Sequence, residues 1–231
     1  MFKTETHLHT AEVSPCSRLS AAEMVELYRR AGYRTVMISD HFQQDYLERV
    51  FGKVPWEAAV DGFLSGYRAA VKAAAGSGMH ILLSAEVQFT GCPNHYLLYG
   101  FDREFLVNCP DLLTMGIEAC YPYARERGVT VVQAHPLRDC VCTPTPAYVD
   151  GFEGHNSNPR HRNFDDDVAA IAREYGKPLT AGSDAHRLED VALSGVLSRR
   201  EICTVQDYVD LLLAGELKLI TGEDDDAVSA E

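Results

Sequence analysis

Short apolar runs alternate with amphipathic helical stretches along the chain, and this alternation limits the folds that the chain can adopt. The runs that predict strands lie at 3–10, 35–38, 81–83, 96–99, 129–132, 151–153, 178–181 and 218–220. The stretches that predict helices lie at 20–31, 56–75, 112–127, 165–175 and 204–214. Strands this apolar, separated by helices, predict an α/β fold with a mostly parallel sheet covered by helices.

Residues that bind divalent metals stand at the ends of these apolar runs. They are His7, His9, Asp40, His41, Glu86, His95, His135, Asp184 and His186. Imidazole suits ions such as zinc and iron, and carboxylate suits magnesium and manganese. An open sheet gathers its site at one switch point, whereas a closed barrel collects side chains from nearly every strand end. Because the candidates come from at least five runs, the pattern favours a barrel with one metal cluster.

The spacing within the motifs supports a shared cluster. In a strand, residues two apart point the same way, so His7 and His9 can reach one ion. Asp184 and His186 repeat this spacing. A carboxylate that closes a buried strand, as Glu86 does, must be paired or bound to metal, and its two oxygens can bridge two ions. Taken singly, each signal has a plain alternative: two surface histidines for the first pair, or a surface salt bridge for Glu86.

Composition narrows the class of protein. We expect the 231 residues to form one domain over 1–222, followed by an acidic, flexible tail over 223–231. The formal net charge of −13 disfavours nucleic acid as a partner, because binding to phosphate backbones takes clustered Lys and Arg. A small anionic substrate stays compatible with an acidic chain if metal cations line the pocket.

The cysteines and the apolar stretches bear on location. The seven cysteines are odd in number and irregularly spaced, and residues 1–5 are too polar for a signal peptide. No apolar stretch approaches the ~20 residues of a membrane span. We therefore expect free thiols in a reducing cytosol, a cytoplasmic location and no membrane association.

In combination, the motifs resemble one known family. His7-Leu-His9-Thr10, Ser39-Asp40-His41, Glu86, His95, Gln133-Ala134-His135-Pro136 and Ser183-Asp184-Ala185-His186 occur in the order of the polymerase-and-histidinol-phosphatase (PHP) family. The resemblance covers residues 3 to about 190. It implies a distorted (β/α)7 TIM-like barrel with two or three divalent ions, whether zinc, manganese or iron, that hydrolyses phosphoesters.

The resemblance also implies how the ligands divide among the ions. One ion takes His7, His9, Glu86 and Asp184, and a second shares Glu86 and adds His95 and His135. A third uses His41, His186 and one ligand from the loop after His9. Here the chain departs from the family pattern, because that loop offers Glu12, Ser14 and Cys16. Glu12 is the conservative choice, while Cys16 would draw the site toward zinc or iron, or else simply pack.

Catalytic and substrate-binding roles follow from the same resemblance and from loop positions. His186 is a candidate for protonating the leaving alcohol, and Asp40 for orienting a histidine ligand. Arg18, Arg138 and Arg160 lie on loops after site elements, where each is either a phosphate ligand or a solvated surface residue.

Three further histidines are left outside the predicted site. His155 and His161 are expected at the surface, and His80 at the opposite end of the barrel.

The leading hypothesis is hydrolysis of a small phosphomonoester by a hydroxide held between the ions of a di- or trinuclear site. One alternative is an amidohydrolase-type barrel, although that class uses a carbamylated lysine where this chain has Glu86. The other is a PHP module that binds metal without turnover. The identity of the substrate and the oligomeric state stay open at this level.

Overall fold

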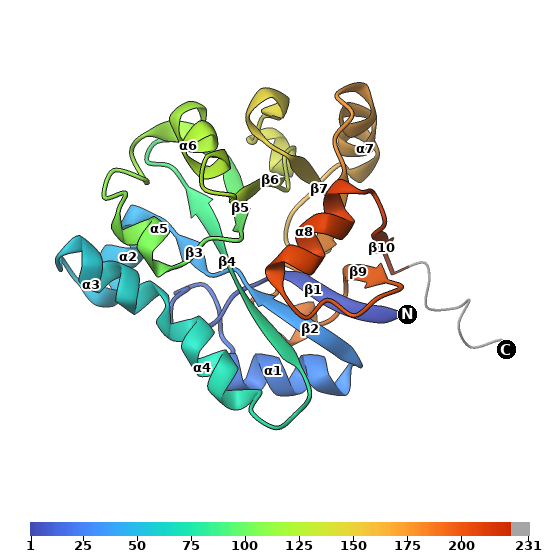
Figure 1. Cartoon of the computed structure of the whole chain (residues 1–231), viewed down its shortest axis with the longest axis horizontal. Helices are drawn as coiled ribbons and strands as arrows, with labels where there is room; N and C mark the ends of the chain where they lie inside the picture. Colours follow the sequence, from blue (N-terminus) through green and yellow to red (C-terminus); the bar gives the residue numbers. More distant parts are fainter. Residues whose placement is uncertain (223–231) are drawn as a thin grey trace, which may run out of the picture.

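The strands form a nearly closed, barrel-like sheet in a computed structural model that describes residues 1–222 (Figure 1). The order across the sheet is β10-β9-β1-β2-β4-β5-β6-β7-β8, with β3 paired to β4. The bounds are β1 Phe2–Leu8, β2 Tyr33–Ile38, β3 His41–Phe42, β4 His80–Gln88, β5 His95–Tyr99, β6 Thr130–Ala134, β7 Gly151–Asn156, β8 Leu179–Gly182, β9 Gly195–Ser198 and β10 Lys218–Ile220. A parallel bridge between Leu8, at the end of β1, and Ala185, just after β8, connects these two strands across the gap in the sheet. The predicted α/β TIM-like barrel is confirmed. The tail predicted for 223–231 lies outside the described residues.

Five of the nine strand pairings within residues 1–222 are parallel; β9 runs against β1 and β10, and β5 runs against both of its neighbours. It pairs antiparallel with β4 and with β6, placing His95 opposite Gln88 and Ala134. The turn that reverses the chain contains Gly91 at φ 77°, a conformation that glycine adopts without strain. Because β5 is reversed, its first residue lies at the barrel end where the parallel strands finish. The sheet is therefore less parallel than expected, and the reversal of β5 brings His95 to the site end.

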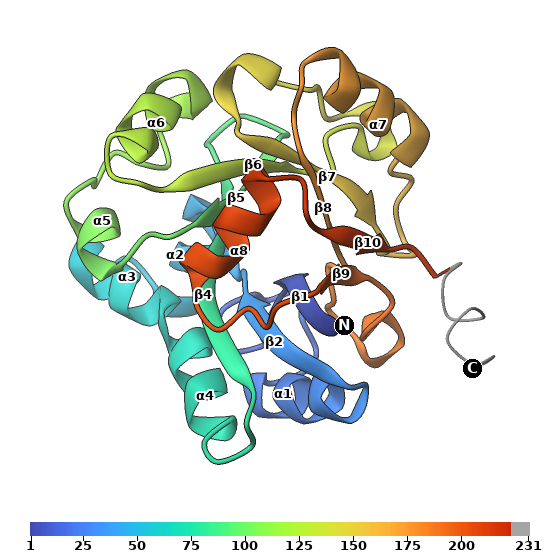
Figure 2. The same ribbon diagram turned by 45° about the vertical axis from the view of Figure 1, so that its right-hand side comes forward.

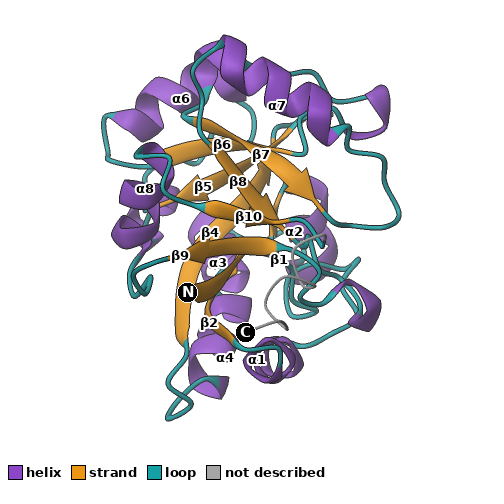
Figure 3. Ribbon diagram, turned by 90° about the vertical axis from the view of Figure 1, so that its right-hand side faces the viewer, coloured by secondary structure: helices purple, strands orange, loops and turns teal. Residues whose placement is uncertain are grey.

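The described helices cover the outside of the sheet, as Figures 1 and 3 show, except for α8, which packs against the inward-facing strand residues. They are α1 Ala21–Arg30, α2 Gln44–Phe51, α3 Trp56–Phe63, α4 Ser65–Ala73, α5 Arg103–Val107, α6 Gly116–Arg125, α7 Asp165–Glu174 and α8 Val205–Leu213. A capping box of Ser20 and Glu23 begins α1, within the stretch predicted as a helix over 20–31. The helix predicted over 56–75 is divided at Leu64 into α3 and α4. Within residues 1–222, no helix is long and apolar enough to cross a bilayer.

The core has a layer outside the barrel and one inside it. The outer layer packs strand residues such as Leu98 and Val131 against α3, α5, α6 and α7. The inner layer contains Leu97, Tyr99 and Val132 together with residues of α8. Alternate residues of β5 thus enter different layers, as the two-residue period of a strand requires. Helix α8 fills the barrel interior away from the strand ends that carry the histidines, so those ends are left for a site (Figure 2).

Candidate metal centre

The first group of donor atoms lies where β1, β4 and β8 end. The Nε2 atoms of His7 and His9 are 3.2 Å apart, and His9 Nε2 lies 3.1 Å from Asp184 Oδ1. Glu86 completes the group, with Oε1 3.5 Å from His7 Nε2 and Oε2 3.5 Å from His9 Nε2. All four side chains are buried. The structure thus brings together the four residues expected to share one ion.

The second group is formed around the same glutamate. Glu86 Oε1 lies 2.9 Å from His95 Nδ1 and 2.8 Å from His135 Nε2. His95 is the first residue of β5, and His135 directly follows the end of β6. Since Glu86 contacts both groups, its carboxylate has the position of a bridge.

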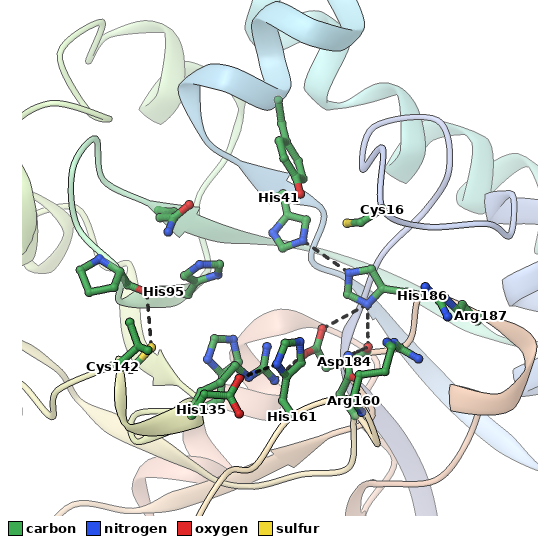
Figure 4. A pocket seen from close by; sticks show the side chains of 17 residues that line it. Cys16, His41, His95, His135, Cys142, Arg160, His161, Asp184, His186 and Arg187 are labelled. Atoms are coloured by element: carbon green, nitrogen blue, oxygen red, sulfur yellow. Dashed lines mark hydrogen bonds and ion pairs between the residues drawn. The ribbon is translucent and has the colours of Figure 1, made fainter.

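The third group contains His41 and His186. Their Nε2 atoms are 3.4 Å apart, and His41 Nδ1 lies 2.7 Å from Glu86 Oε2. Cys16 lines the same cavity as both histidines, and Figure 4 shows its sulfur directed toward them. The structure does not bring Glu12 to this group. Both Glu12 carboxylate oxygens accept from the backbone N–H of Ala21, at 2.9 and 3.1 Å, because the first turn of α1 offers free donors there.

Unpartnered polar atoms test whether these residues fit divalent ions. His41 Nδ1, Glu86 Oε2 and His135 Nδ1 are buried and have no hydrogen-bond partner. The first two are only 2.7 Å apart, yet they are not aligned for a hydrogen bond. Leaving a buried polar group unpaired costs about 1–3 kcal/mol. A cation between such atoms would satisfy them, so the residues present fit a metal centre.

The backbone is held in an uncommon conformation at two of these residues. His135 has φ 31° and Asp184 has φ 50°, values that side chains other than glycine adopt rarely. Strain of this kind persists where the surrounding structure imposes it, and it gathers at functional sites. Here it turns both side chains inward at the ends of their strands.

Positively charged neighbours lower the pKa values of the two carboxylates in the centre. Burial alone would raise the pKa of Glu86, but the charges of His95, His41 and His7 outweigh it and hold that pKa well below the ordinary value. Asp184 behaves in the same way beside Arg138 and His7. The site therefore contains two ionised, buried carboxylates.

The pKa values of two imidazoles at the centre are lowered as well, because burial and nearby positive charge disfavour their protonation. Burial and the nearby His41 and His186 hold the pKa of His9 well below its ordinary value. Burial and Arg138 lower the pKa of His135 to about 4. Both rings are therefore neutral at pH 7, which is the form that binds metal.

Glu153 of β7 is a site residue that the sequence reasoning missed. Its Oε1 accepts from His7 Nδ1 at 2.8 Å, and its Oε2 accepts from the His135 backbone N–H and from Asn156 Nδ2, both at 2.9 Å. Because Nδ1 of His7 carries the proton of this bond, Nε2 is left with its lone pair toward the other donors. The signal was present, since Glu153 is a carboxylate in a short buried strand, as Glu86 is.

Asp40 supports the centre through an intermediate residue. It accepts from the backbone N–H and the hydroxyl of Thr10 and from Ser14 Oγ, at 2.6–2.8 Å. Ser14 Oγ in turn lies 3.5 Å from His9 Nδ1 and accepts from the His41 backbone N–H at 3.1 Å. Burial raises the pKa of Asp40 to about 6. It therefore orients the loop after β1, with Ser14 standing between it and the histidine.

A cavity of about 470 Å³ opens over the centre. Two of the three predicted arginines line it: Arg138 donates to Asp184 Oδ2 at 2.6 Å, and Arg160 donates to both Asp190 oxygens at 2.7 Å. The third, Arg18, is exposed and does not line the cavity. Arg187 lines it as well and was not expected.

Of the three remaining histidines, one lines the cavity and two do not. His161, expected at the surface, lines the cavity and pairs with Asp139. His155 pairs with Asp165 at the start of α7. His80 begins β4, away from the site, and lies 3.5 Å from Glu201.

Comparisons with known proteins agree on the family and the fold. Residues 166–217 match the family model described as PHP-associated. No curated protein matches the chain in sequence. The fold is similar to that of a two-domain protein from Bacteroides vulgatus ATCC 8482 that contains a predicted PHP-like metal-dependent phosphoesterase, with a TM-score of 0.69 and 13% identity. That alignment covers 95% of this chain and 64% of the Bacteroides protein, so the chain spans less than two thirds of it.

Two further solved structures share the fold. One is the lesion-specific endonuclease PfuEndoQ from Pyrococcus furiosus, with a TM-score of 0.65 and 14% identity over 94% of this chain and 57% of that one. The other is an amidohydrolase from Chromobacterium violaceum, with a TM-score of 0.58 and 15% identity over 97% of this chain and 99% of that one. Identities this low carry the fold alone. Together with the PHP-associated segment, the shared fold supports the resemblance to PHP proteins that the motifs indicated.

Proposed function

We propose that this protein is a metal-dependent hydrolase that cleaves phosphoesters, with a small phosphomonoester as its substrate. The observation that carries the proposal is the position of Glu86. Its buried carboxylate lies within 3.5 Å of ring nitrogens of His7, His9, His41, His95 and His135. A carboxylate among so many nitrogen donors is suited to bridging divalent ions, and the PHP-like relative from Bacteroides vulgatus is described as a metal-dependent phosphoesterase.

The chain's own residues would hold two or three ions. We assign the first to His7, His9, Glu86 and Asp184, the second to Glu86, His95 and His135, and the third to His41 and His186. When bound, zinc, manganese or iron ions supply an activated water and neutralise charge on the phosphoryl oxygens. Glu153 keeps the Nε2 lone pair of His7 directed inward throughout.

The cavity supports a small, anionic substrate. Its volume of about 470 Å³ is in the range of small-molecule pockets. Arg138, Arg160 and Arg187 place positive charge on its wall, although the whole chain is strongly acidic. The net charge of −13 disfavours the DNA substrate that the name of the Pyrococcus endonuclease indicates for that relative.

His186 is our candidate for protonating the leaving alcohol. Its Nδ1 lies 2.8 Å from the Asp184 carbonyl, so Nε2 is the atom that faces the centre. Burial opposes protonation, but the Cys16 thiol and Asp184 raise the pKa of His186 above its ordinary value. Nε2 either binds an ion or carries the proton, and the two roles exclude each other at any one moment.

The test is turnover of a generic aryl phosphate by purified protein loaded with manganese, zinc or iron. We expect phosphate release, and we expect Glu86→Ala to lose bound metal and activity together. Glu126→Ala, an exposed glutamate on α6's C-terminal side, is the matched control and should keep both. Activity that survives in metal-depleted Glu86→Ala would contradict the mechanism.

The same assay separates two other functions. Cleavage of an amide in place of a phosphoester would favour an amidohydrolase, a class to which the Chromobacterium relative belongs by name. Metal binding without any turnover would favour a non-catalytic PHP module.

A further inference from the structure

The loop between β1 and α1 brings a thiol to the third group of donor atoms. Cys16 is partly buried and lines the cavity together with His41 and His186. In Figure 4 the sulfur points toward the space beside both rings.

The other candidate donors of this loop are engaged elsewhere. Glu12 caps α1 through the Ala21 N–H, and Ser14 bonds Asp40 and the His41 backbone. Of the three side chains that the loop offers, Cys16 alone faces the two imidazoles with an atom that binds metal well.

The two histidines themselves point to a ligand at this place. His41 is 8% exposed, and its Nδ1 lies 2.7 Å from Glu86 Oε2, so Nε2 is the ring atom directed toward His186. Its Nε2 faces His186 Nε2 at 3.4 Å, and at least one of those two atoms must present a lone pair to the other. Buried nitrogens arranged in this way are satisfied together by one cation.

We infer that the Cys16 thiolate completes a donor set with His41 and His186, and that this position binds zinc or iron(II) in preference to magnesium or manganese. Thiolate is a soft ligand that selects zinc and iron, whereas the carboxylates of the other two positions also suit harder ions. Tyr46 contacts the thiol and packs its ring against His41 at 5.2 Å between centroids, so it shields one side of the set. The inference rests on the proposed metal-dependent hydrolase and adds the chemical preference of one of its ion positions.

Cobalt(II) substitution tests the inference without relying on turnover. The apoprotein is titrated with cobalt(II), and the near-ultraviolet absorption that arises from sulfur-to-cobalt charge transfer is followed. We expect this band in the wild-type protein and its loss in Cys16→Ser, which keeps the size of the side chain and removes the thiolate. Zinc content measured in parallel should fall by one ion in Cys16→Ser, while circular dichroism reports whether the variant is folded.

Cys142→Ser is the matched control, because Cys142 lines the same cavity but its thiol donates to the Pro93 carbonyl at 3.3 Å. The band should persist in this variant. Absence of the band from the wild-type protein, or its survival in Cys16→Ser, would overturn the inference. Aryl phosphate turnover without the band would overturn the inference and leave the proposed function standing. The band without any turnover would support the inference and contradict the proposed function.

Discussion

At the residue scale, buried glutamates organise the centre, and each has a different task. Glu86 lies among the imidazoles, and Glu153 orients one of them. Glu5 accepts from the backbone N–H groups of Thr6, His7 and Ser183, so it ties the end of β1 to the residue before Asp184. Burial raises the pKa of Glu5 to about 7. None of the three can be replaced by an apolar side chain without leaving buried donors unpaired.

Glu153→Gln is expected to weaken zinc binding by about 10–100-fold, the effect usual for partners that orient a metal-binding histidine. Glu153 accepts three hydrogen bonds, and an amide would turn its NH₂ group toward one of those donors. Competition with a chromophoric chelator measures the affinity. Glu174→Gln, at an exposed position on α7, is the control and should bind zinc as the wild-type protein does. Equal affinity in both variants would show that Glu153 does not orient His7.

At the element scale, close packing of α4 against the loop after β1 positions the third group. A Cβ atom built on Gly66 would collide with Thr10 Oγ1 and Asp40 Oδ2, the two side chains that fix this loop. Glycine is usually unfavourable inside a helix, so its presence in α4 reflects the space that the Thr10–Asp40 pair needs. The loop that carries Cys16 is thus held in place partly by its packing against α4.

Gly66→Ala is expected to lower the free energy of unfolding by about 1–3 kcal/mol, as overpacking does, although alanine is the better helix former. Urea unfolding measures the change. Gly62→Ala in α3 is the comparison: the nearest contact of its Cβ would be the partly exposed Phe51 ring at 2.8 Å, not the loop after β1, so we expect a smaller loss of stability. An unchanged or higher stability of Gly66→Ala would show that the loop after β1 can shift to accommodate the methyl group without loss of stability.

At the scale of the whole molecule, barrel closure concentrates negative charge at one end of an acidic protein. Glu86, Asp184 and Glu153 are all buried at the site end, and the chain carries a net charge of −13. Bound cations would offset this charge and would bind the folded state only, because their donors come from strands far apart in sequence. Stability is therefore expected to depend on metal.

We expect zinc to raise the midpoint of thermal unfolding and a chelator to lower it. At a free ion concentration of 100 times the dissociation constant, one site contributes about 2.7 kcal/mol. Differential scanning calorimetry of the wild-type protein and of Glu86→Ala measures the effect. The increment should disappear in Glu86→Ala, which removes the bridge, and a zinc-dependent increment of the same size in both proteins would rule out this centre as its source.

Much of the fold could be predicted because strands and helices leave local patterns. The helices predicted over 20–31 and 165–175 correspond to α1, which begins with a capping box at Ser20, and to α7, whose first turn contains Asp165–Asp167. The reversal of β5 could not be predicted, because a short apolar run reads the same in either direction. Strand β9 and helices α2 and α5 were also missed, since each is short and its stability comes from packing against other elements.

Two features are encoded locally in the sequence. One is the alternation of strands and helices, and the other is the presence of imidazoles and carboxylates at the strand ends. Both features follow from the spacing of residues along the chain, which does not depend on tertiary contacts. Only the tertiary structure decided which donors meet. It turned Glu12 to the N-terminus of α1, brought Cys16 to His41 and His186, and placed Glu153 behind His7. The direction of a loop side chain depends on contacts with distant elements, here α1, α4 and β7, and no spacing along the chain encodes those contacts.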